Sequence, residues 1–376
     1  MDISFNKEER MIINSARDFF KKETPTSLVR ELIKDEKGYS PAIWKKMSEL
    51  GWLGISFDEA YGGYGGSFFE LALIFEEIGR AVIPSPFFST VVLSGFLLQD
   101  HASDEMKSAF LPKIIEGKCI STLAFSGKSG IYDQNAIDLQ ADALENGYRL
   151  NGTAFFVPYA HVADQIICAA KMKSADNDGV TLFMVEGKTE GLETIPLKTI
   201  SGDGIECMVN LKNVMVEPDR IVGETGKGWG YIEKIWPKIS AILSCEIVGG
   251  MNKVVEMTTD YVNDRVQFGK PLAAQQVIQH MCVDMSMKAE TSRHAAHYAA
   301  WLVSEGHESE KEAAVAKAWC GESYKDATKI AHQVTGGMGF TEEYDLHLYT
   351  RHAKKLEVLF GNEAFHRSIV ADDLGL

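Results

Sequence analysis

Two kinds of hydrophobic pattern alternate along the chain and divide it into three regions. From the N-terminus to about residue 118, apolar residues recur at three- and four-residue steps, the spacing of amphipathic helices. From Cys119 to about Gly223, apolar and polar residues alternate between turn signals, as in strands. The helical spacing then returns and continues to the C-terminus. The pattern therefore predicts helices, then a mostly antiparallel β region of roughly 100 residues, then long helices.

Helix start and stop signals punctuate the first region. Asn6 and Ser67 are each followed three residues later by Glu, which predicts two capping boxes. The helix that starts after Ser67 is expected to end at Gly79, since glycine often terminates helices. A further helix, around residues 104–115, is expected to break at Pro112, which cannot donate a backbone hydrogen bond.

The middle region carries a hairpin signal. Asn146-Gly147 separates two alternating runs, and this dipeptide favours a tight turn between antiparallel strands. Residues 179–186 and 205–216 predict further strands. In the last region, residues 281–304 and 311–334 carry apolar residues at helical spacing, and Gly336-Gly337 is expected to stop the second of these helices.

Composition narrows the class of protein. The chain has 376 residues, is 45% hydrophobic and 24% charged, and carries a formal charge of -15. Such an acidic surface disfavours nucleic acid and anionic membranes. No run of about 18 apolar residues predicts a membrane span, and the N-terminus lacks the apolar core of a signal peptide. We therefore expect a globular cytoplasmic protein with no nucleic-acid or membrane partner.

The cysteines indicate neither a metal site nor a disulfide framework. They are widely spaced, without a CxxC pair or a histidine at ligand spacing, and are interpreted as reduced, buried thiols. The six are Cys119, Cys168, Cys207, Cys245, Cys282 and Cys320.

Two glycine-rich stretches resemble phosphate-binding loops. Residues 60–68 ("AYGGYGGSF") are not set in a strand-loop-helix unit followed by an acidic residue, as a dinucleotide fold requires. Residues 223–230 ("GETGKGWG") lack the spacing of a P-loop. Both are interpreted as structural turns.

Two later stretches combine polar side chains with glycine turns. In "DRVQFGKPL", Arg265 ends a helix just before a tight turn, which places a guanidinium beside backbone N–H groups and suits a pyrophosphate. In "HQVTGGMGFT", Gln333 precedes a pair of glycines that would let a ligand approach the backbone. On pattern alone, each stretch also fits an ordinary corner between helices.

Taken together, these stretches resemble the flavin-dependent acyl-CoA dehydrogenases. "DRVQFGKPL", "QVTGGMGFT" and "LYTRHAK" match the motif order and spacing of that family, and "DEAYGGYGGS" resembles its N-terminal glycine turn. The resemblance covers almost the whole chain. It implies an α+β multi-domain fold with an N-terminal helical domain (1–118), a middle antiparallel β domain (119–226) and a C-terminal domain like a four-helix bundle (227–376).

The resemblance implies FAD as cofactor, bound at a subunit interface in a dimer or tetramer. Two segments of the C-terminal region match FAD contacts of the family. Arg265, Gln267 and Phe268 match residues that reach the pyrophosphate and adenine side of a neighbouring subunit's FAD. The second FAD contact segment is matched by Gln333, Gly336 and Gly337.

In the β region, the resemblance implies contacts with the flavin ring. Ser126 matches a flavin-contacting hydroxyl, although Gly127 follows where the family usually has a carboxylate. Phe156 matches an aromatic residue beside the ring. Pro158 stands where a threonine hydroxyl often bonds flavin N5, and proline has neither a hydroxyl nor an N–H. The environment of N5 is therefore expected to differ from that of the family.

The largest departure concerns the base that removes the α-proton of the thioester. Most relatives carry a Glu before Gly-Thr in the final loop, but here the loop reads "LFGNEA". Phe360 occupies the position of the base. Asn362 replaces the Thr and is counted among the cofactor contacts. A phenyl ring cannot accept a proton, but the backbone N–H of Phe360 could still bind the thioester carbonyl of the substrate.

Another carboxylate is needed, and Glu246 is the candidate. Some relatives place the base on an earlier helix, at the position of Ile239 here. Ile239, Leu243 and Glu246 share a helix face, with Leu243 expected to contact substrate. Burial would raise the pKa of a lone carboxylate toward that of a useful base. A structural pairing of Glu246 with a nearby Lys or Arg is the alternative, and Glu357 and Glu363 are weaker candidates for the base.

Three functions remain open at this point. The first is an acyl-CoA dehydrogenase that forms the α,β double bond of an acyl-CoA and passes electrons to an electron-transfer flavoprotein. The second is a partner subunit that completes the FAD site of a heteromeric dehydrogenase whose other chain holds the base. The third, indicated only by Pro158, is a flavin-dependent monooxygenase on the same fold.

Overall fold

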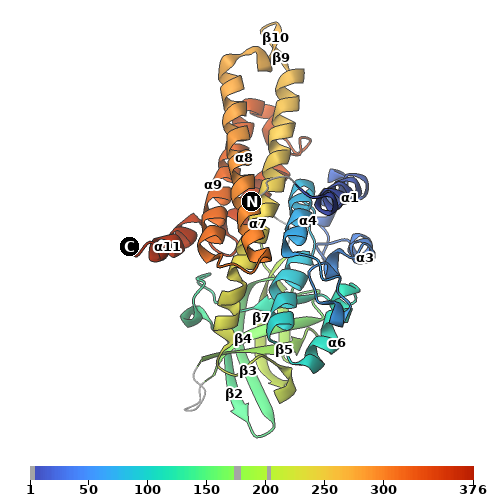
Figure 1. The fold of residues 1–376 in the computed structure, drawn as a ribbon, viewed down its shortest axis with the longest axis vertical. Helices are drawn as coiled ribbons and strands as arrows, with labels where there is room; N and C mark the ends of the chain where they lie inside the picture. Colours follow the sequence, from blue (N-terminus) through green and yellow to red (C-terminus); the bar gives the residue numbers. More distant parts are fainter. Residues whose placement is uncertain (1–4, 173–178, 201–204) are drawn as a thin grey trace. The chain divides into compact units, whose positions relative to one another are not determined.

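The computed structural model describes residues 5–172, 179–200 and 205–376 (Figure 1). The chain divides into two compact units. The sheet unit comprises Glu31–Gly66 and Pro84–Trp236, and the helical unit comprises Met1–Arg30, Ser67–Ile83 and Pro237–Leu376. Three segments far apart in the sequence therefore build the helical unit.

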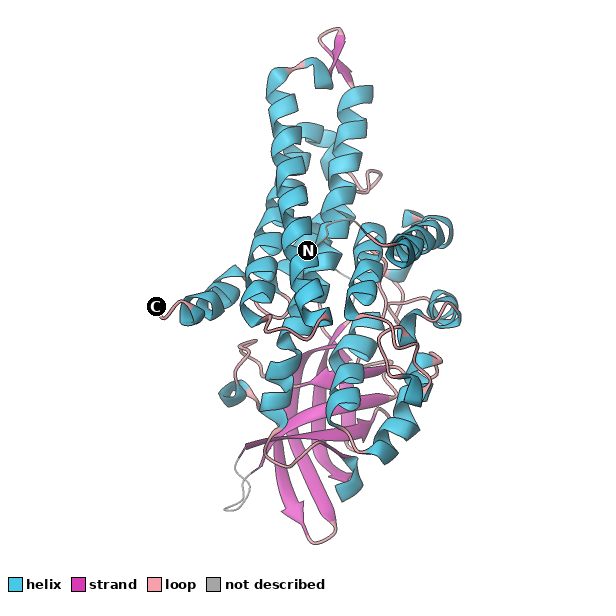
Figure 2. Ribbon diagram, viewed as in Figure 1, coloured by secondary structure: helices cyan, strands magenta, loops and turns pink. Residues whose placement is uncertain are grey.

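The sheet unit is built on one eight-stranded sheet in the order β6-β7-β3-β2-β4-β5-β8, with β1 parallel to β4 (Figure 2). Antiparallel pairs dominate, which confirms the predicted kind of sheet. The strands are β1 (Ser121–Ala124), β2 (Gln140–Leu144), β3 (Gly147–Pro158), β4 (Gln165–Met172), β5 (Gly179–Glu186), β6 (Leu192–Pro196), β7 (Glu206–Val216) and β8 (Ile221–Val222). The hairpin predicted at Asn146-Gly147 joins β2 to β3.

Helices precede and follow the strands, as the sequence pattern predicts. Before the sheet come α1 (Lys7–Glu23), α2 (Thr26–Leu32), α3 (Pro41–Glu49), α4 (Phe68–Ala81), the π-helix η3 (Phe88–Gly95), α5 (Phe96–His101) and α6 (Asp104–Ile115). After it come α7 (Gly228–Asp264), α8 (Gln276–Ser304), α9 (Glu310–Thr335), α10 (Leu346–Val358) and α11 (Glu363–Asp373).

Within the helical unit, α9 is the central helix. It packs against α8, α10 and α11, while α4 packs against α1 and α8. Small side chains line α9 on its buried side, including Ala316, Ala327 and Ala331, which are all fully buried. This allows close packing of three helices around one.

Both predicted capping boxes are present. The Asn6 side chain accepts from Glu9 N, and the Glu9 carboxylate accepts from Asn6 N. Ser67 and Glu70 repeat the arrangement at the start of α4. These starts were predictable because a capping box involves only residues close in sequence.

The expectation that Gly79 ends its helix is wrong, because α4 continues through Gly79 to Ala81. An added Cβ at Gly79 would lie 1.8 Å from Glu246 O, and one at Gly249 would lie 1.7 Å from Glu76 O. The two glycines therefore allow the backbones of α4 and α7 to touch.

The expectation that Pro112 breaks its helix is also wrong, because α6 runs on to Ile115. Proline has a backbone φ compatible with a helix and removes only one hydrogen bond. One more turn therefore fits before the chain leaves the helix at Gly117, which has a φ of 67°.

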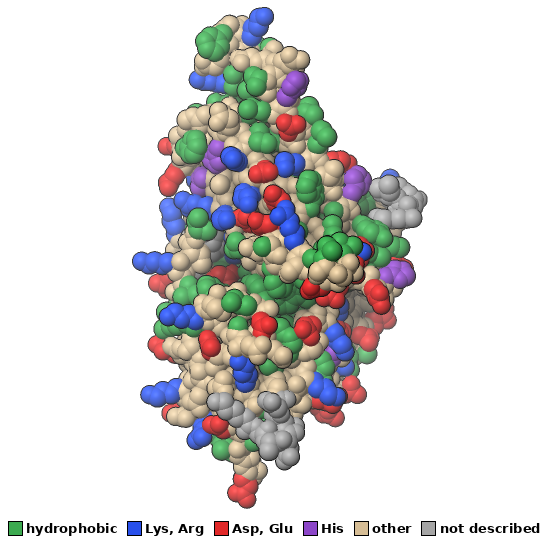
Figure 3. All heavy atoms as spheres, turned by 90° about the vertical axis from the view of Figure 1, so that its left-hand side faces the viewer, with side chains coloured by type: hydrophobic (Ala, Val, Ile, Leu, Met, Phe, Trp, Pro, Cys, Tyr) green, Lys and Arg blue, Asp and Glu red, His purple; other side chains and the backbone are tan. Residues whose placement is uncertain are grey.

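The surface does not present a field of one sign on the face drawn in Figure 3, where acidic and basic side chains are interspersed. Hydrophobic and basic side chains meet at the top of that view, the end of the helical unit at which Figure 1 labels β9 (Val266–Gln267) and β10 (Lys270–Pro271). Among the described helices, none combines the length and the hydropathy needed to cross a bilayer.

Candidate active site

The Arg265 segment forms a small hairpin at the end of α7. β9 (Val266–Gln267) and β10 (Lys270–Pro271) pair antiparallel, with Phe268 and Gly269 as the turn. Both turn residues have positive φ, 52° and 76°, as a type I′ turn requires. The Phe268 side chain is 94% exposed, so the hairpin presents an aromatic ring to the surroundings of the helical unit.

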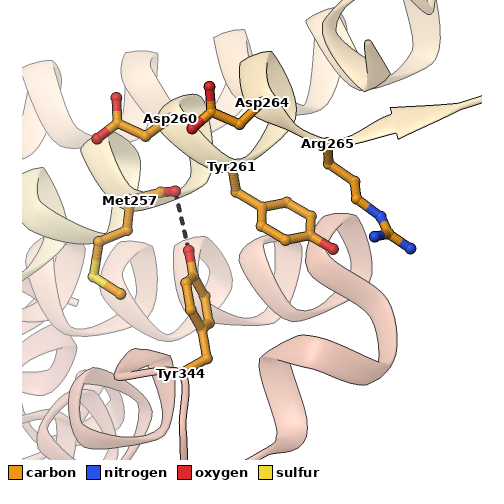
Figure 4. A pocket seen from close by; sticks show the side chains of 6 residues that line it. All are labelled: Met257, Asp260, Tyr261, Asp264, Arg265 and Tyr344. Carbon is orange, nitrogen blue, oxygen red and sulfur yellow. Dashed lines mark hydrogen bonds between the residues drawn. The ribbon is translucent and has the colours of Figure 1, made fainter. Parts of the chain in front are cut away.

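A pocket of about 440 Å³ lies at the base of this hairpin (Figure 4). Its lining residues come from the last turns of α7 and from the loop before α10, and they are Met257, Asp260, Tyr261, Asp264, Arg265 and Tyr344. Tyr344 donates to Met257 O at 3.0 Å. In Figure 4 the guanidinium of Arg265 extends on the side of Tyr261, while Asp260 and Asp264 point away from both. An anion is therefore favoured at the Arg265 end alone.

The second predicted FAD segment lies close to the first. Tyr261 OH donates to Thr335 O at 3.2 Å, which connects the end of α7 to the end of α9. Gln333 is exposed in the last turn of α9, two residues before Thr335. Gly336 has φ 59° and ψ -139°, a conformation essentially restricted to glycine. The sequence-predicted residues of the helical unit thus gather at one end of it.

In the sheet unit, the two predicted flavin segments are neighbours. Phe155 N donates to Ser126 O at 2.8 Å, which places the end of β1 beside β3. The pairing of β3 with β7 shifts register between Ala154 and Val157, and within this bulge Phe156 has a φ of 56° and a 44% exposed side chain. A bulge can redirect a side chain out of a sheet, and here it exposes the Phe156 ring.

Pro158 is the last residue of β3 and pairs with Glu206 of β7. Its ring is buried at the strand end. The missing N–H is tolerated there because a strand terminus need not continue the ladder. The position is therefore structurally sound, but it offers no hydrogen-bond donor to a ligand.

These side chains fit FAD. The exposed guanidinium of Arg265 and the side-chain amides of Gln267 and Gln333 suit a pyrophosphate. Within the part of the chain that the structure describes, no carboxylate pairs with Arg265. Backbone at Gly336 and Gly337 is open, because an added Cβ at either would meet nothing within 4 Å. In the sheet unit, Phe156 offers an exposed ring, while the hydroxyl of the buried Ser126 donates to Gly127 O at 3.3 Å.

Glu246 lies on α7 with a side chain 14% exposed. Its carboxylate is 3.0 Å from His352 Nε2, and His352 Nδ1 is 3.4 Å from Tyr324 OH. The neutral imidazole satisfies both contacts if Nε2–H donates to Glu246 and Nδ1 accepts from Tyr324. Burial, together with the charge of Glu246, raises the pKa of Tyr324 and keeps it a donor. The partner of Glu246 is thus a histidine rather than the Lys or Arg considered from the sequence.

The face of α7 that carries Glu246 is otherwise apolar. Ile239 and Leu243 are buried on the same side of the helix, as the spacing predicts. Glu246 thus shares a helix face with two buried apolar residues, and its carboxylate lies 3.0 Å from His352 Nε2. The catalytic role of Glu246 and the substrate contact of Leu243 stay predictions.

The final loop joins α10 to α11. Phe360 has a φ of 54° and is 3% exposed, and Gly361 has a φ of 103°. Asn362 caps α11, its side chain accepting from Phe365 N at 3.1 Å. Asn362 is therefore the N-cap of α11, a role that the sequence analysis did not predict. The signal was available, because asparagine directly before a helix is a favoured N-cap.

The two weaker base candidates lie on either side of this loop. The Glu357 carboxylate receives hydrogen bonds from Lys325 at 2.5 Å and Lys354 at 2.6 Å. Burial alone would raise its pKa, but the two ammonium groups outweigh burial and lower it. A carboxylate held ionised by two lysines is a poor base. Glu363 is in the first turn of α11, where a helix N-terminus favours its charge.

Sequence reasoning missed two buried residues behind the loop. Lys317 of α9 donates to Leu356 O, Glu357 O and Gly361 O, and His366 Nε2 lies 3.1 Å from Phe360 O. A weak signal existed, because Lys317 falls among small apolar residues in "AAVAKAWCG" on the buried face of its helix.

These two groups make stability depend on pH. Burial lowers the pKa of Lys317 to about 7, and burial with the charge of Lys317 lowers the pKa of His366 to about 3. Both folded values lie below the unfolded ones, so unfolding takes up protons. The contribution of His366 is fully present above about pH 6.5 and is lost as pH falls toward 3, while stability gains from Lys317 as pH rises above 7.

We expect the thermal unfolding midpoint of the wild type to fall as pH drops from 6.5 to 4, more steeply than that of His366→Gln. The histidine alone should contribute on the order of 3 kcal/mol across this pH range. His294→Gln, which alters a half-exposed histidine, is the matched control and should keep the wild-type slope. Equal slopes in all three proteins would contradict the burial of a neutral His366.

Comparisons with known proteins agree with the arrangement of elements. Residues 226–375 match the family described as "Acyl-CoA dehydrogenase, C-terminal domain". Residues 6–118 match "Acyl-CoA dehydrogenase, N-terminal domain".

Individual relatives span nearly the whole chain. The chain is 26% identical to an acryloyl-CoA reductase (NADH) of Anaerotignum propionicum over 381 residues, covering 100% of this chain and 96% of the relative. It is 27% identical to the CarC subunit of a caffeyl-CoA reductase-Etf complex of Acetobacterium woodii, covering 98% of both. The structure of butyryl-CoA dehydrogenase from Megasphaera elsdenii superposes with a TM-score of 0.93 at 25% identity, covering 100% of both chains.

Proposed function

We propose, since this chain belongs to the acyl-CoA dehydrogenase family, that it interconverts an acyl-CoA thioester and its α,β-unsaturated form. FAD is the cofactor, and the enzyme is an oxidoreductase acting on a carbon–carbon bond of the acyl group. When bound, the flavin supplies the redox chemistry by accepting or returning hydride.

The chain's own residues divide the work of binding. We assign the pyrophosphate and adenine side of FAD to Arg265, Gln267 and Phe268, and a second FAD contact to Gln333, Gly336 and Gly337. We assign the flavin ring to Ser126, Phe156 and Pro158, and count Asn362 among the cofactor contacts. The clustering of the first group at one end of the helical unit supports this assignment, through the Tyr261–Thr335 contact. Phe360 and Leu243 are assigned to the thioester substrate.

Glu246 is the proposed base, and one observation carries the proposal. It is a carboxylate on a buried, apolar helix face. Its hydrogen-bond partner is the imidazole of His352 rather than a lysine or an arginine. Glu357, by contrast, is held by two lysines, which lower its pKa. Because Nε2–H of His352 already donates to one oxygen of this carboxylate, a proton taken by Glu246 would go to its other oxygen.

A half-site partner subunit is the second candidate. It is favoured by Phe360, which occupies the usual base position and is buried. In that case Arg265 and Gln333 complete a flavin site whose base belongs to another chain. Either way we propose that the chain forms an oligomer. We also propose an electron-transfer flavoprotein as its electron acceptor, which is supported by the relative named as a subunit of an Etf complex.

The experiment is a turnover assay on the purified chain, with FAD content measured first. Saturated acyl-CoAs are offered with an artificial electron acceptor, and enoyl-CoAs with a reductant, because relatives named for both directions are known. Flavin-dependent turnover of either supports the proposal. Flavin or turnover that appears only after co-expression of a second chain supports the partner role. Oxygen-dependent hydroxylation would point to a monooxygenase instead.

Arg265→Gln is expected to weaken FAD binding roughly 10- to 100-fold, because a charge-assisted contact to the pyrophosphate is lost. Flavin titration of the apoprotein measures this. Lys270→Gln removes a charge from the same exposed hairpin and is the control. If both variants lose FAD equally, the effect is one of net charge and not of Arg265.

A further inference from the structure

Lys317 is an unusual residue for the interior of a helical unit. Its side chain is 1% exposed, and within the described residues no carboxylate lies within salt-bridge distance of its ammonium. Its three neighbours are backbone carbonyl oxygens, at 2.8 Å (Leu356), 3.3 Å (Glu357) and 3.0 Å (Gly361). A buried lysine is costly unless its donors are satisfied, and here an ammonium with three N–H groups meets three acceptors.

The positions of these carbonyls matter. Leu356 and Glu357 belong to the last turn of α10, where carbonyl oxygens have no partner within the helix. Gly361 lies on the far side of Phe360. One ammonium therefore ties together both ends of the turn that contains Phe360, and the negative end of the α10 dipole favours a cation at this place.

The turn needs such support. Phe360 adopts a left-handed backbone conformation, which a residue with a Cβ avoids. Such a conformation persists only when its surroundings over-determine it, and it is found most often at functional sites. Lys317 holds the flanking carbonyls, and His366 holds Phe360 O at 3.1 Å from the opposite helix.

We propose that Lys317 is a positioning residue for the reaction, holding the α10–α11 turn in the shape that presents the Phe360 backbone to the thioester. The proposal rests on the proposed function and deepens it. In this chain the usual carboxylate at position 360 is absent, so the remaining contribution of the turn is made by its backbone. Backbone chemistry requires a fixed turn, because a misplacement of about 1 Å can cost about 100-fold in rate.

The charged and titratable groups around Lys317 come from three helices. Cys320 lies on α9 itself, Glu357 on α10, and Glu363 and His366 on α11. Burial lowers the pKa of the lysine to about 7, and the thiol and the carboxylates act against this. Opening the turn would expose the amine and take up a proton, so the closed turn gains stability as pH rises above 7.

The test compares Lys317→Met with Lys325→Met in the FAD-loaded protein. Lys325 is a lysine of the same helix that bonds only the Glu357 side chain and is 40% exposed, so its loss leaves the loop carbonyls bound. We expect hydrogen exchange of the amides of residues 359–366 to be at least about 10-fold faster in Lys317→Met. The value of kcat should fall about 10-fold with KM within about twofold, while strands β3 to β5 keep wild-type exchange.

Equal exchange in the two variants overturns the proposal, whatever the turnover. Faster exchange spread evenly over α8, α9 and the turn also overturns it, because the lysine would then only stabilise the fold. If Lys317→Met does not fold, Lys317→Gln, which keeps two N–H donors, takes its place. A third outcome is faster exchange in Lys317→Met while the wild type turns over no thioester. This would overturn the proposed function, but it would still show that Lys317 holds the turn.

Discussion

Glu246→Gln should lower kcat by roughly 10²- to 10⁴-fold, the usual contribution of a general base. Glutamine has nearly the same shape and can still bond His352, so FAD content and the thermal midpoint should stay close to wild type. Stopped-flow bleaching of the flavin by an acyl-CoA would measure the chemical step directly. In the wild type, the fall of kcat/KM at low pH should report the protonation of the base in the free enzyme. This fall should disappear in the variant.

The chain offers a matched control. Glu76 and His297 form a second Glu–His pair in the helical unit, 2.7 Å apart and comparably buried. Glu76→Gln removes the same charge from a similar environment, and it should leave kcat within a few-fold of the wild type. Full activity in Glu246→Gln would remove Glu246 from the mechanism. If the wild type turns over only with a second chain, and Glu246→Gln in that complex is fully active, the base belongs to the partner.

Gly249→Ala should destabilise the protein by about 3 kcal/mol. The added methyl would lie 1.7 Å from Glu76 O and 2.9 Å from Arg80 N, both backbone atoms of α4 that no rotamer change can move. The two helices would have to separate along a buried contact. A drop of roughly 5 °C in the thermal midpoint is expected.

Gly230→Ala is the control on the same helix. Nothing lies within 4 Å of an added Cβ there, and the position is exposed, so alanine should leave stability unchanged or raise it by up to about 1 kcal/mol. Because Glu246 O faces Gly79 across the same contact, Gly249→Ala should also reduce kcat. A Gly249→Ala protein with wild-type stability would show that α4 and α7 can separate at no cost.

Much of the fold was accessible from local signals. The α-β-α order, both capping boxes and the hairpin at Asn146-Gly147 depend on residues a few positions apart, and the structure has all of them. The same holds for the glycine turn after Arg265, whose φ values match a two-residue hairpin. Short-range patterns are reliable here because caps, turns and helix periodicity are set by the chain itself.

The candidate site was predictable only in part. Motif order placed Arg265 and Gln333 in one functional group, and the structure brings their segments together through Tyr261 and Thr335. Periodicity placed Glu246 on an apolar face, but it could not identify His352, which is 106 residues away. Likewise, nothing near Lys317 in the sequence indicates that its acceptors are carbonyls of a loop about forty residues further on.

The sequence by itself determined the order of elements and the family. Only the tertiary structure showed that Gly79 lies against the backbone of α7 and that Lys317 donates to carbonyl oxygens of the α10–α11 turn. A glycine at a helix end and a glycine beneath a crossing helix look alike in sequence, since both need only the absence of a Cβ. A lysine on a helix looks solvated until the fold buries it, and its role then depends on acceptors that packing alone brings within 3 Å.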